Sequence, residues 1–416
     1  MKVAIIGGGI SGNTAAYYLH PKHDITLFEA GNHLGGHTHT HDVESEGKNI
    51  AIDTGFIVFN DRTYPLFNNL LSDLEVPIQK TQMSFSVANN ETGLEYNGHN
   101  LSSLFAQRSN VLNLGFLSML KDIVRFNRQA RQLSRSMQDS LSLGELLVQQ
   151  NYGQMFINNY ILPMGAAIWS TDPNTMLQFP ARFFIRFFEN HGLLNLRNRP
   201  QWYVVAQGSA RYVEAMATGY MHRVQLNTAI ESVQRQAQGV MVKPVNQPAQ
   251  QFDRVFMATH SNQSLAILGA HATPKERQVL SAIPYQTNEV VLHTDDSLMP
   301  RNRRAWAAWN YHIDQQQTSA NATVTYHMNC LQGLDTQQDF FVSLNASERI
   351  APSKVIKTLH YEHPVFTPEG VDLQQQQGVL NEGPILYCGA YWGKGFHEDG
   401  VASALSAVGH MEDQYA

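Results

Sequence analysis

The amino-terminal segment constrains the fold of this chain more than any other stretch. An apolar run at residues 2–6 leads into Gly7, Gly9 and Gly12, spaced as Gly-x-Gly-x-x-Gly, and a helical pattern follows at once. In such a strand–loop–helix unit, the first glycine allows a tight turn and the second lets the backbone approach a pyrophosphate. The third lets helix and strand pack closely. The segment predicts a dinucleotide whose pyrophosphate lies at a helix N-terminus.

A second apolar strand ends in an acid at the position expected for a ribose ligand. Residues 25–28 form this predicted strand, and Glu29 follows it directly. A carboxylate there accepts hydrogen bonds from a ribose diol and would repel a 2′-phosphate. The pattern therefore predicts FAD or NAD rather than NADP.

A second glycine pair favours the flavin nucleotide. Gly35 and Gly36 follow shortly after Glu29, and an Asp-x-Gly turn occurs at residues 53–55. This order resembles the large FAD-dependent family that contains amine oxidases, phytoene desaturases and protoporphyrinogen oxidases. The resemblance implies that the glycine pair crosses near the FAD diphosphate and that the Asp-x-Gly turn runs under the flavin. A basic residue usually follows the pair in that family, and His37 stands there.

The carboxyl-terminal segment resembles the closing motif of the same family. Residues 384–388 read as a buried strand that ends at Gly389, and residues 395–404 open a helix with small side chains along one side. The resemblance implies that this turn contacts the ribityl chain and that the helix N-terminus faces the pyrimidine end of the flavin. A helix dipole there would stabilise negative charge on the reduced flavin. Many relatives have Asp where this chain has Ala390, so no side-chain ligand is expected at that position.

Four segments narrow the resemblance to one branch of the family. Residues 163–170, 258–261, 306–311 and 389–400 are similar to bacterial NAD/FAD-binding proteins related to the flavin domain fused to some plant cyclopropane fatty acid synthases. That branch is mainly associated with fatty-acyl modification. The predicted FAD-binding residues are Gly7, Gly9, Ile10, Ser11, Gly12, Glu29, Ala30, Gly35, Gly36, His37, Thr54, Gly55, Phe56, Ile230, Gly389, Asp399, Gly400 and Val401.

Length and motif placement predict two domains. The chain has 416 residues, more than a single hydrophobic core usually supports, and 43% of them are hydrophobic. The nucleotide-binding pieces place a discontinuous FAD-binding domain at residues 1–80, 203–270 and 380–416. The substrate domain would then comprise residues 81–202 and 271–379, with helices at 110–200 and strands at 285–345. The expected fold class is α/β: a Rossmann-like FAD-binding domain of the amine oxidase and glutathione reductase type with an inserted α+β substrate domain.

Charge and cysteine content exclude several function classes. A net charge of −6 gives no indication of a nucleic-acid partner. Cys330 and Cys388 are too few for a disulfide framework or a metal cluster, and neither lies in a recognisable flavin-attachment motif, so FAD should be non-covalent. No metal is expected, although His37, His39 and His41 alternate. Because the first strand begins at residue 2 and no apolar run is long enough to cross a bilayer, we expect a cytoplasmic protein.

Two departures from the family pattern argue against a conventional amine oxidase. Amine oxidases of the wider family place a lysine near flavin N5, on a strand at the start of the second substrate-domain insertion. Residues 284–293 contain no lysine, and none occurs between Lys275 and Lys354. The family also has an aromatic residue just before its closing Glu-Gly step, where this chain has His397. His397 is therefore the candidate catalytic proton donor or acceptor, the alternative being a histidine that caps the last helix.

Other aromatic and basic residues bear on the substrate. The residues that could wall a substrate pocket, or equally belong to the core, are Trp169, Tyr311, Tyr391, Trp392 and Phe396. Between Arg108 and Arg135 there are six basic residues and one acid, Asp122, among apolar residues at helical spacing. A basic amphipathic helix suits peripheral membrane contact or a lipid tunnel, whereas an ordinary helix with a solvated basic face has the same pattern.

These observations predict an FAD-dependent oxidoreductase that transfers hydride between a fatty-acyl or similarly apolar substrate and flavin N5. One alternative is a flavin amine oxidase that acts on a soluble amine and returns electrons to O₂. A second alternative is a redox-neutral flavin isomerase or mutase. A third is an accessory flavoprotein that supports a lipid methyltransferase partner.

Overall fold

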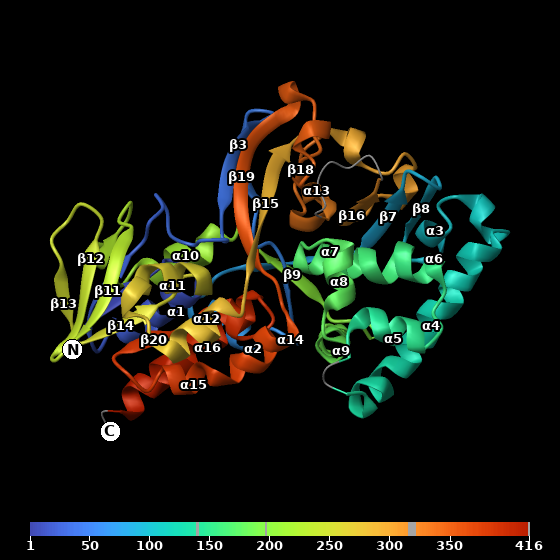
Figure 1. Ribbon diagram of the computed structural model, residues 1–416. Coiled ribbons are helices and arrows are strands. Elements are labelled where there is room, and N and C mark those ends of the chain that lie inside the picture. Colours follow the sequence, from blue (N-terminus) through green and yellow to red (C-terminus); the bar gives the residue numbers. More distant parts are fainter. Residues whose placement is uncertain (139–140, 196–197, 315–321, 415–416) are drawn as a thin grey trace.

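The structure is a computed structural model that describes residues 1–138, 141–195, 198–314 and 322–414. It contains a five-stranded parallel sheet, whose strands β14 (Arg254–Met257) and β20 (Ile385–Tyr387) lie at the left in Figure 1. The strands, in spatial order, are β10 (Val224–Gln225), β2 (Asp24–Phe28), β1 (Lys2–Ile6), β14 and β20. Three distant stretches of the chain therefore build one sheet, and all neighbouring strands run parallel. The predicted α/β fold class with a Rossmann-like sheet is confirmed.

Both faces of this sheet are buried, which explains why its strands are apolar throughout. Val3 and Ile5 pack in one cluster with α1 (Ile10–Leu19) and α16 (His397–Asp413), whereas Ala4 and Ile6 pack in a second cluster on the other face. Helix α10 (Ala210–Ala217) lies against α1. The carboxyl ends of the parallel strands consequently open toward the N-termini of α1 and α16.

A small antiparallel sheet covers the second face of the parallel sheet. It consists of β11 (Ile230–Gln236), β12 (Gly239–Pro244) and β13 (Gln250–Phe252), followed by α11 (Ser261–Leu268) and α12 (Pro274–Ser281). Strands β10 and β11 are separate, because Asn227 between them has a left-handed φ of 51° and the chain turns there. Val279 and Leu280 of α12 pack in this cluster, so the helix lies with the nucleotide-binding part although its residues were expected in the substrate domain.

A seven-stranded sheet and a group of helices form the remainder of the molecule (Figure 1). The strands, in spatial order, are β19 (Val355–Pro364), β15 (Tyr285–His293), β18 (Phe341–Leu344), β17 (Thr323–His327), β16 (Trp309–Ile313), β7 (Phe85–Asn89) and β8 (Leu94–Asn97). The helical lobe comprises α3 (Leu101–Leu104), α4 (Leu114–Ser136), α5 (Leu143–Gln149), α6 (Gln154–Phe156), α7 (Leu162–Trp169), α8 (Pro173–Gln178) and α9 (Ala181–Asn190). Strand β19 lies outside the strand region expected from the sequence. Half of its residues are exposed and none is buried, so it lacks the alternation of apolar and polar residues that predicts a strand.

Shorter elements connect these parts. They are β3 (Thr40–Ser45), β4 (Lys48–Asp53), β5 (Phe59–Asn60), α2 (Pro65–Asp73), β6 (Ile78–Thr81), β9 (Trp202–Val205), α13 (Met328–Gln332), α14 (Pro368–Leu373) and α15 (Gln377–Leu380). The long strands β15 and β19 pair along their whole length. They lie at one edge of the seven-stranded sheet and extend from it toward the nucleotide-binding part (Figure 1). Among the helices of the described ranges, none is long and apolar enough to cross a bilayer.

Candidate functional site

The glycine loop leaves open space before the N-terminus of α1. Gly9 is the N-cap of this helix, no side chain caps it, and the first turn contains no acid. The first amides of a helix lack partners within the helix and carry partial positive charge. A Cβ atom built on Gly9 would meet no atom within 4 Å, whereas one on Gly12 would lie 1.8 Å from the carbonyl oxygen of Gly7. The space beside Gly9 is therefore open to a ligand, whereas Gly12 must lack a side chain so that α1 can pack against the loop.

The second glycine pair crosses the first glycine loop. The amide of Gly35 donates to the carbonyl of Gly8 at 2.8 Å, and a Cβ on Gly36 would come within 3.1 Å of the Gly9 Cα. His37 follows directly, and its Nε2 is buried without a hydrogen-bond partner. This buried nitrogen is left without a protein partner beside the glycine crossing, and burial keeps the imidazole neutral.

Glu29, the predicted ribose ligand, contacts the backbone on both sides of this crossing. One carboxylate oxygen accepts from the amide of Gly8 at 2.6 Å, and the other accepts from the amide of Gly31 at 2.7 Å. The backbone of Glu29 in turn accepts from the amide of Thr228 at 2.8 Å, which brings the buried Ile230 near Glu29. The neighbouring Ala30 is exposed.

The Asp-x-Gly turn is fixed against the segment that follows the glycine pair. The amide of Phe56 donates to the carbonyl of His37 at 2.8 Å, and a Cβ on Gly55 would lie 2.0 Å from the same oxygen. Thr54 is buried and its amide donates to the carbonyl of His39. The turn residues Thr54, Gly55 and Phe56 therefore lie together with His37, as the predicted cofactor site requires.

Asp53, the first residue of this turn, holds neighbouring segments of the chain around it. Its buried carboxylate accepts from the amide and the hydroxyl of Ser209, from the hydroxyl of Thr40 and from the amide group of Gln332. Burial raises the pKa of Asp53 to about 6, although the hydrogen bonds from Thr40 and Ser209 oppose the shift. This carboxylate therefore joins three segments that are distant in the sequence.

The closing motif lies against the first helix. The hydroxyl of Ser11 donates to the carbonyl of Gly400 at 3.0 Å, and a Cβ on Gly400 would contact Ile10 at 2.6 Å. Asp399 accepts from the amide of Phe396, and the buried Val401 follows. Gly389 lies at the end of β20, where its amide donates to the hydroxyl of Ser403. The two helix N-termini thus adjoin at the carboxyl edge of the parallel sheet.

His397 is the first residue of α16 and is buried. Its Nε2 lies 2.9 Å from the hydroxyls of both Thr38 and Tyr212, and its ring stacks on Phe56 with centroids 3.5 Å apart. Burial lowers the pKa of His397 to about 3, so the imidazole is neutral at physiological pH. Its role as a proton donor or acceptor stays a prediction, and the hydroxyls of Thr38 and Tyr212 are the groups with which it can exchange a proton.

The five candidate pocket residues fall into two groups. Trp169, Tyr311 and Phe396 belong to or pack against the cluster that includes the helical lobe. Tyr391 and Trp392 instead pack in the cluster behind the parallel sheet. Because the two groups belong to different clusters, the structure does not bring Tyr391 and Trp392 together with the other three.

Histidines gather beside the glycine crossing. The ring of His37 lies 5.4 Å from that of His363 and 5.7 Å from that of His260, and His39 stacks on His33 with centroids 4.0 Å apart. Within the described ranges, no group of three or more His, Cys, Asp or Glu side chains has the geometry to hold a metal ion. Burial and the neighbouring imidazoles lower the pKa of His37 well below its ordinary value.

Two site residues were not predicted from the sequence. Asn13 is fully buried, and its side-chain amide donates to the carbonyls of Gly8 and Gly9, which holds the glycine loop in place. An amide side chain in the first turn, directly after the glycine loop, is the signal that could have identified it. Tyr212 reaches Thr38 and His397 from α10, and no local pattern marks it.

The parallel sheet, the two crossing glycine loops and the acid at the end of β2 define a dinucleotide-binding protein of the flavoprotein type. Residues 10–343 match the family described as flavin containing amine oxidoreductase, so the chain belongs to this family. It is accordingly an FAD-dependent oxidoreductase of the amine oxidase superfamily. No curated protein matches the sequence.

Solved structures of this fold resemble the chain over nearly its whole length. Cyclohexylamine oxidase from Brevibacterium oxydans IH-35A aligns with a TM-score of 0.69 and 13% identity, covering 99% of both chains. Putrescine oxidase bound to putrescine aligns with a TM-score of 0.68 and 14% identity, also over 99% of both chains. A CLA-producing fatty acid isomerase from P. acnes aligns with a TM-score of 0.68 and 14% identity, covering 100% of this chain and 98% of that one. At these identities the likeness shows the fold alone.

Replacing Glu29 with Ala should weaken FAD binding by about 1–3 kcal/mol, the scale of lost hydrogen bonds to a charged acceptor. Titration of the apoprotein with FAD, followed by quenching of flavin fluorescence, measures this loss. Glu29→Gln is the matched control, because it keeps the size and one acceptor oxygen and should lose less. If a loaded Glu29→Ala protein keeps its FAD affinity but loses flavin reduction, Glu29 is not the ribose ligand.

Proposed function

We propose that this oxidoreductase holds FAD non-covalently and transfers hydride between a fatty-acyl or similarly apolar substrate and flavin N5. The flavin supplies the hydride chemistry when bound. The α1 N-terminus, the glycine crossing and Glu29 would hold the nucleotide, and the Thr54–Phe56 turn with the start of α16 would hold the isoalloxazine end. The protein's own contribution is to position an apolar chain beside His397 and to exclude water there.

An aromatic cluster next to His397 is the observation that carries this proposal. It consists of Trp169, Phe183, Phe187, Phe366 and Phe396. The ring of Phe396, which directly precedes His397, lies 4.9 Å from that of Phe187, and Phe187 lies 4.7 Å from Trp169. The cluster links the start of α16 to α7 and α9 of the helical lobe. Trp169, Phe187 and Phe366 are buried, so a hydrocarbon chain that packs against this cluster would gain dispersion contacts. None of the five members is an acid that could pair with an ammonium group.

Charge near the cluster favours a carboxylate over an amine. Lys394 lies two residues before Phe396, and burial lowers its pKa, with Asp399 opposing and Arg186 adding to the shift. His191, whose ring stacks on Phe187 at 3.9 Å, also has a pKa lowered to about 4, mainly by burial, to which Lys394 contributes. A cation at this position attracts a fatty-acid carboxylate and repels a protonated amine.

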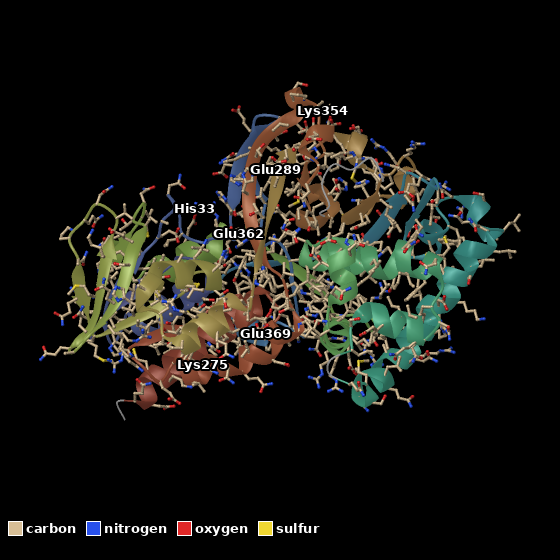
Figure 2. All side chains as sticks on the ribbon, in the orientation of Figure 1. His33, Lys275, Glu289, Lys354, Glu362 and Glu369 are labelled. Carbon is tan, nitrogen blue, oxygen red and sulfur yellow. The ribbon has the colours of Figure 1, made fainter. Side chains whose placement is uncertain are left out.

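The lysine arrangement of the long strands points in the same direction. Strand β15 contains no lysine, and the two lysines that bracket it in the sequence are far from each other in the fold. Figure 2 shows Lys275 on the lower helices and Lys354 at the far end of the β15–β19 ribbon, where its Nζ lies 3.2 Å from Asp295. The lysine expected of an amine oxidase is therefore missing from this strand.

Oleate should perturb the flavin absorbance spectrum of the oxidised holoprotein, whereas benzylamine and a polyamine should not bleach it. Burial of methylene groups contributes about 0.8 kcal/mol each, so a long chain reaches micromolar affinity with one polar anchor. Lys394→Gln should weaken oleate binding about tenfold, the scale of one charge-assisted hydrogen bond, and should leave methyl oleate binding unchanged. The matched control is Lys357→Gln, an exposed lysine on β19. Rapid bleaching by an amine with no response to oleate would restore the amine oxidase alternative.

A redox-neutral isomerisation of an acyl double bond is the second candidate. The fold likeness to a fatty acid isomerase is the observation that favours it. The two candidates differ in electron balance, because a dehydrogenation leaves reduced flavin that an acceptor must oxidise, whereas an isomerisation returns the hydride to the substrate. Anaerobic incubation with an unsaturated fatty acid decides between them: a stoichiometric loss of oxidised flavin indicates dehydrogenation, and product formed without net flavin reduction indicates isomerisation.

A further inference from the structure

We propose that the outer end of the helical lobe is a docking surface for the interface of an anionic lipid bilayer. This surface, called the lobe tip, comprises α3, the short 3₁₀ turn η1 (Arg108–Val111), the first turns of α4 and the adjacent 3₁₀ turn η6 (Arg303–Ala305). It lies at the side of the molecule away from the parallel sheet (Figure 1). The proposal does not rest on the proposed substrate, since docking would hold for any reaction at the flavin.

The lobe tip exposes large apolar side chains that a protein surface normally covers. Its exposed members, with their exposed fractions, are Leu101 (75%), Val111 (51%), Leu112 (85%), Leu114 (82%) and Leu117 (38%). Leu112, Leu114 and Leu101 are the three most exposed large apolar side chains of the described residues. Single exposed leucines are ordinary, but a group of five apolar side chains between Leu101 and Leu117 indicates an interaction surface.

These side chains are not displaced members of the hydrophobic core. Helix α4 has a separate core face, on which Phe116, Met119 and Phe126 are fully buried. Asn113, between the two most exposed leucines, caps the helix by accepting from the amide of Phe116 at 3.1 Å. The cap and the core face fix the start of α4, so Leu112 and Leu114 are held in the solvent by a well-defined local structure.

Basic side chains surround the apolar ones. Arg108 and Lys121 are exposed on η1 and α4, and the acid of this stretch, Asp122, is buried and paired with Arg125 at 3.0 Å. η6 packs against α3, where Asn302 donates to the carbonyl of Ala106 at 2.7 Å. This contact adds two exposed cations to the lobe tip, namely Arg303 and Arg304, and the exposed Arg301 lies just before η6. The chain as a whole carries a net charge of −6, so the tip is a local concentration of positive charge.

Exposed leucines bordered by cations match the chemistry of a bilayer interface. The apolar groups enter the boundary between headgroups and acyl chains, and the cations face anionic headgroups. A groove of about 560 Å³ continues along α4, lined by Leu120 and Val124 with Lys121 and Arg128. A second copy of this chain fits less well, because a symmetric contact through the tip would bring its arginines and lysines against each other.

The test compares binding of the holoprotein to sucrose-loaded vesicles of phosphatidylcholine with and without phosphatidylglycerol, by cosedimentation. Wild-type protein should bind the anionic vesicles more strongly, and added salt should weaken binding. The double variant Leu112→Ser, Leu114→Ser should bind at least about tenfold more weakly, because it removes the two most deeply inserting side chains. Both side chains are largely exposed, so the variant should retain its fold and its flavin.

Two controls make the result specific to the lobe tip. Val148→Ser removes an apolar side chain that is 74% exposed on α5, outside the tip, and should leave vesicle binding unchanged. Arg108→Gln with Lys121→Gln should reduce binding to anionic vesicles and lessen the salt dependence. Absent binding of the wild-type protein, or equal binding by the leucine variant, would overturn the proposal. Sedimentation velocity that shows a lipid-free dimer abolished by the leucine variant would assign the tip to self-association instead.

Discussion

Gly9→Val should abolish FAD binding and leave the fold intact. Gly9 has φ of −74° and ψ of −173°, an extended conformation that valine adopts readily, and its Cβ would meet no protein atom within 4 Å. The valine methyl groups would instead occupy the space before α1 that the pyrophosphate requires. We expect the dissociation constant for FAD to rise by about 100-fold or more, equivalent to at least about 2.7 kcal/mol.

Calorimetric titration of the apoprotein with FAD measures this loss, and circular dichroism with thermal unfolding measures the fold. Gly12→Val is the matched control, since its Cβ would lie 1.8 Å from the Gly7 carbonyl oxygen. That variant should lose the fold itself, through a clash between α1 and the loop. A Gly9→Val protein that still binds FAD tightly would mean that the pyrophosphate does not lie at this loop.

The parts of the site where only glycine fits the backbone could be predicted from the sequence. Gly7, with φ of 103°, and Gly12, which nearly touches Gly7, are positions where a side chain cannot fit, so their spacing alone specifies the loop. Glu29 was predictable because a strand end fixes where its side chain lies relative to the loop. The sequence could bring these residues to one loop because each constraint acts within one βαβ unit, and the role of Glu29 as ribose ligand stays a prediction.

Contacts between distant segments could not be predicted in the same way. Tyr212 and His397 are separated by 185 residues and meet only because α10 and α16 both pack against α1. Tyr391 and Trp392 were expected either to wall the substrate pocket or to belong to the core, and the sequence does not decide between the two. Proximity along the chain does not specify on which face of the parallel sheet a side chain packs. After β20, both side chains pack in the core cluster that also contains Ala4 and Ile6 of β1.

Lowering the pH from 7 to 5 should reduce the free energy of unfolding by several kcal/mol. Burial is the main cause of a lowered pKa at His312 and His397, to about 3, and at His41, His191 and His293, to about 4. All five side chains are buried. Because the folded pKa lies below the unfolded value of about 6.5, stability is present above that pH and is lost as the pH falls. Each histidine contributes at most about 2 kcal/mol to the loss at pH 5.

Asp53 acts in the opposite direction over part of this range. Its folded pKa of about 6 lies above the unfolded value of about 3.8, so its protonation stabilises the folded state as the pH falls toward 4. At pH 5 the stabilisation from one carboxyl group offsets the loss from about one histidine. The five histidines therefore outweigh Asp53, and the free energy of unfolding falls as the pH is lowered. Urea unfolding of the holoprotein at pH 5, 6 and 7 measures the slope.

His312→Leu provides the sharpest test of the acid sensitivity, because this histidine lies in β16, far along the chain from the nucleotide loops. Its Nε2 is buried without a hydrogen-bond partner, and Arg349 adds to the lowering of its pKa while Asp314 opposes it. The variant should unfold with a pH slope smaller by nearly one proton between pH 6.5 and 5. His271→Leu replaces an exposed histidine and should leave the slope unchanged. A stability that does not change between pH 7 and 5, or a slope that is the same in His312→Leu, would mean that the buried imidazoles are not kept neutral by the fold.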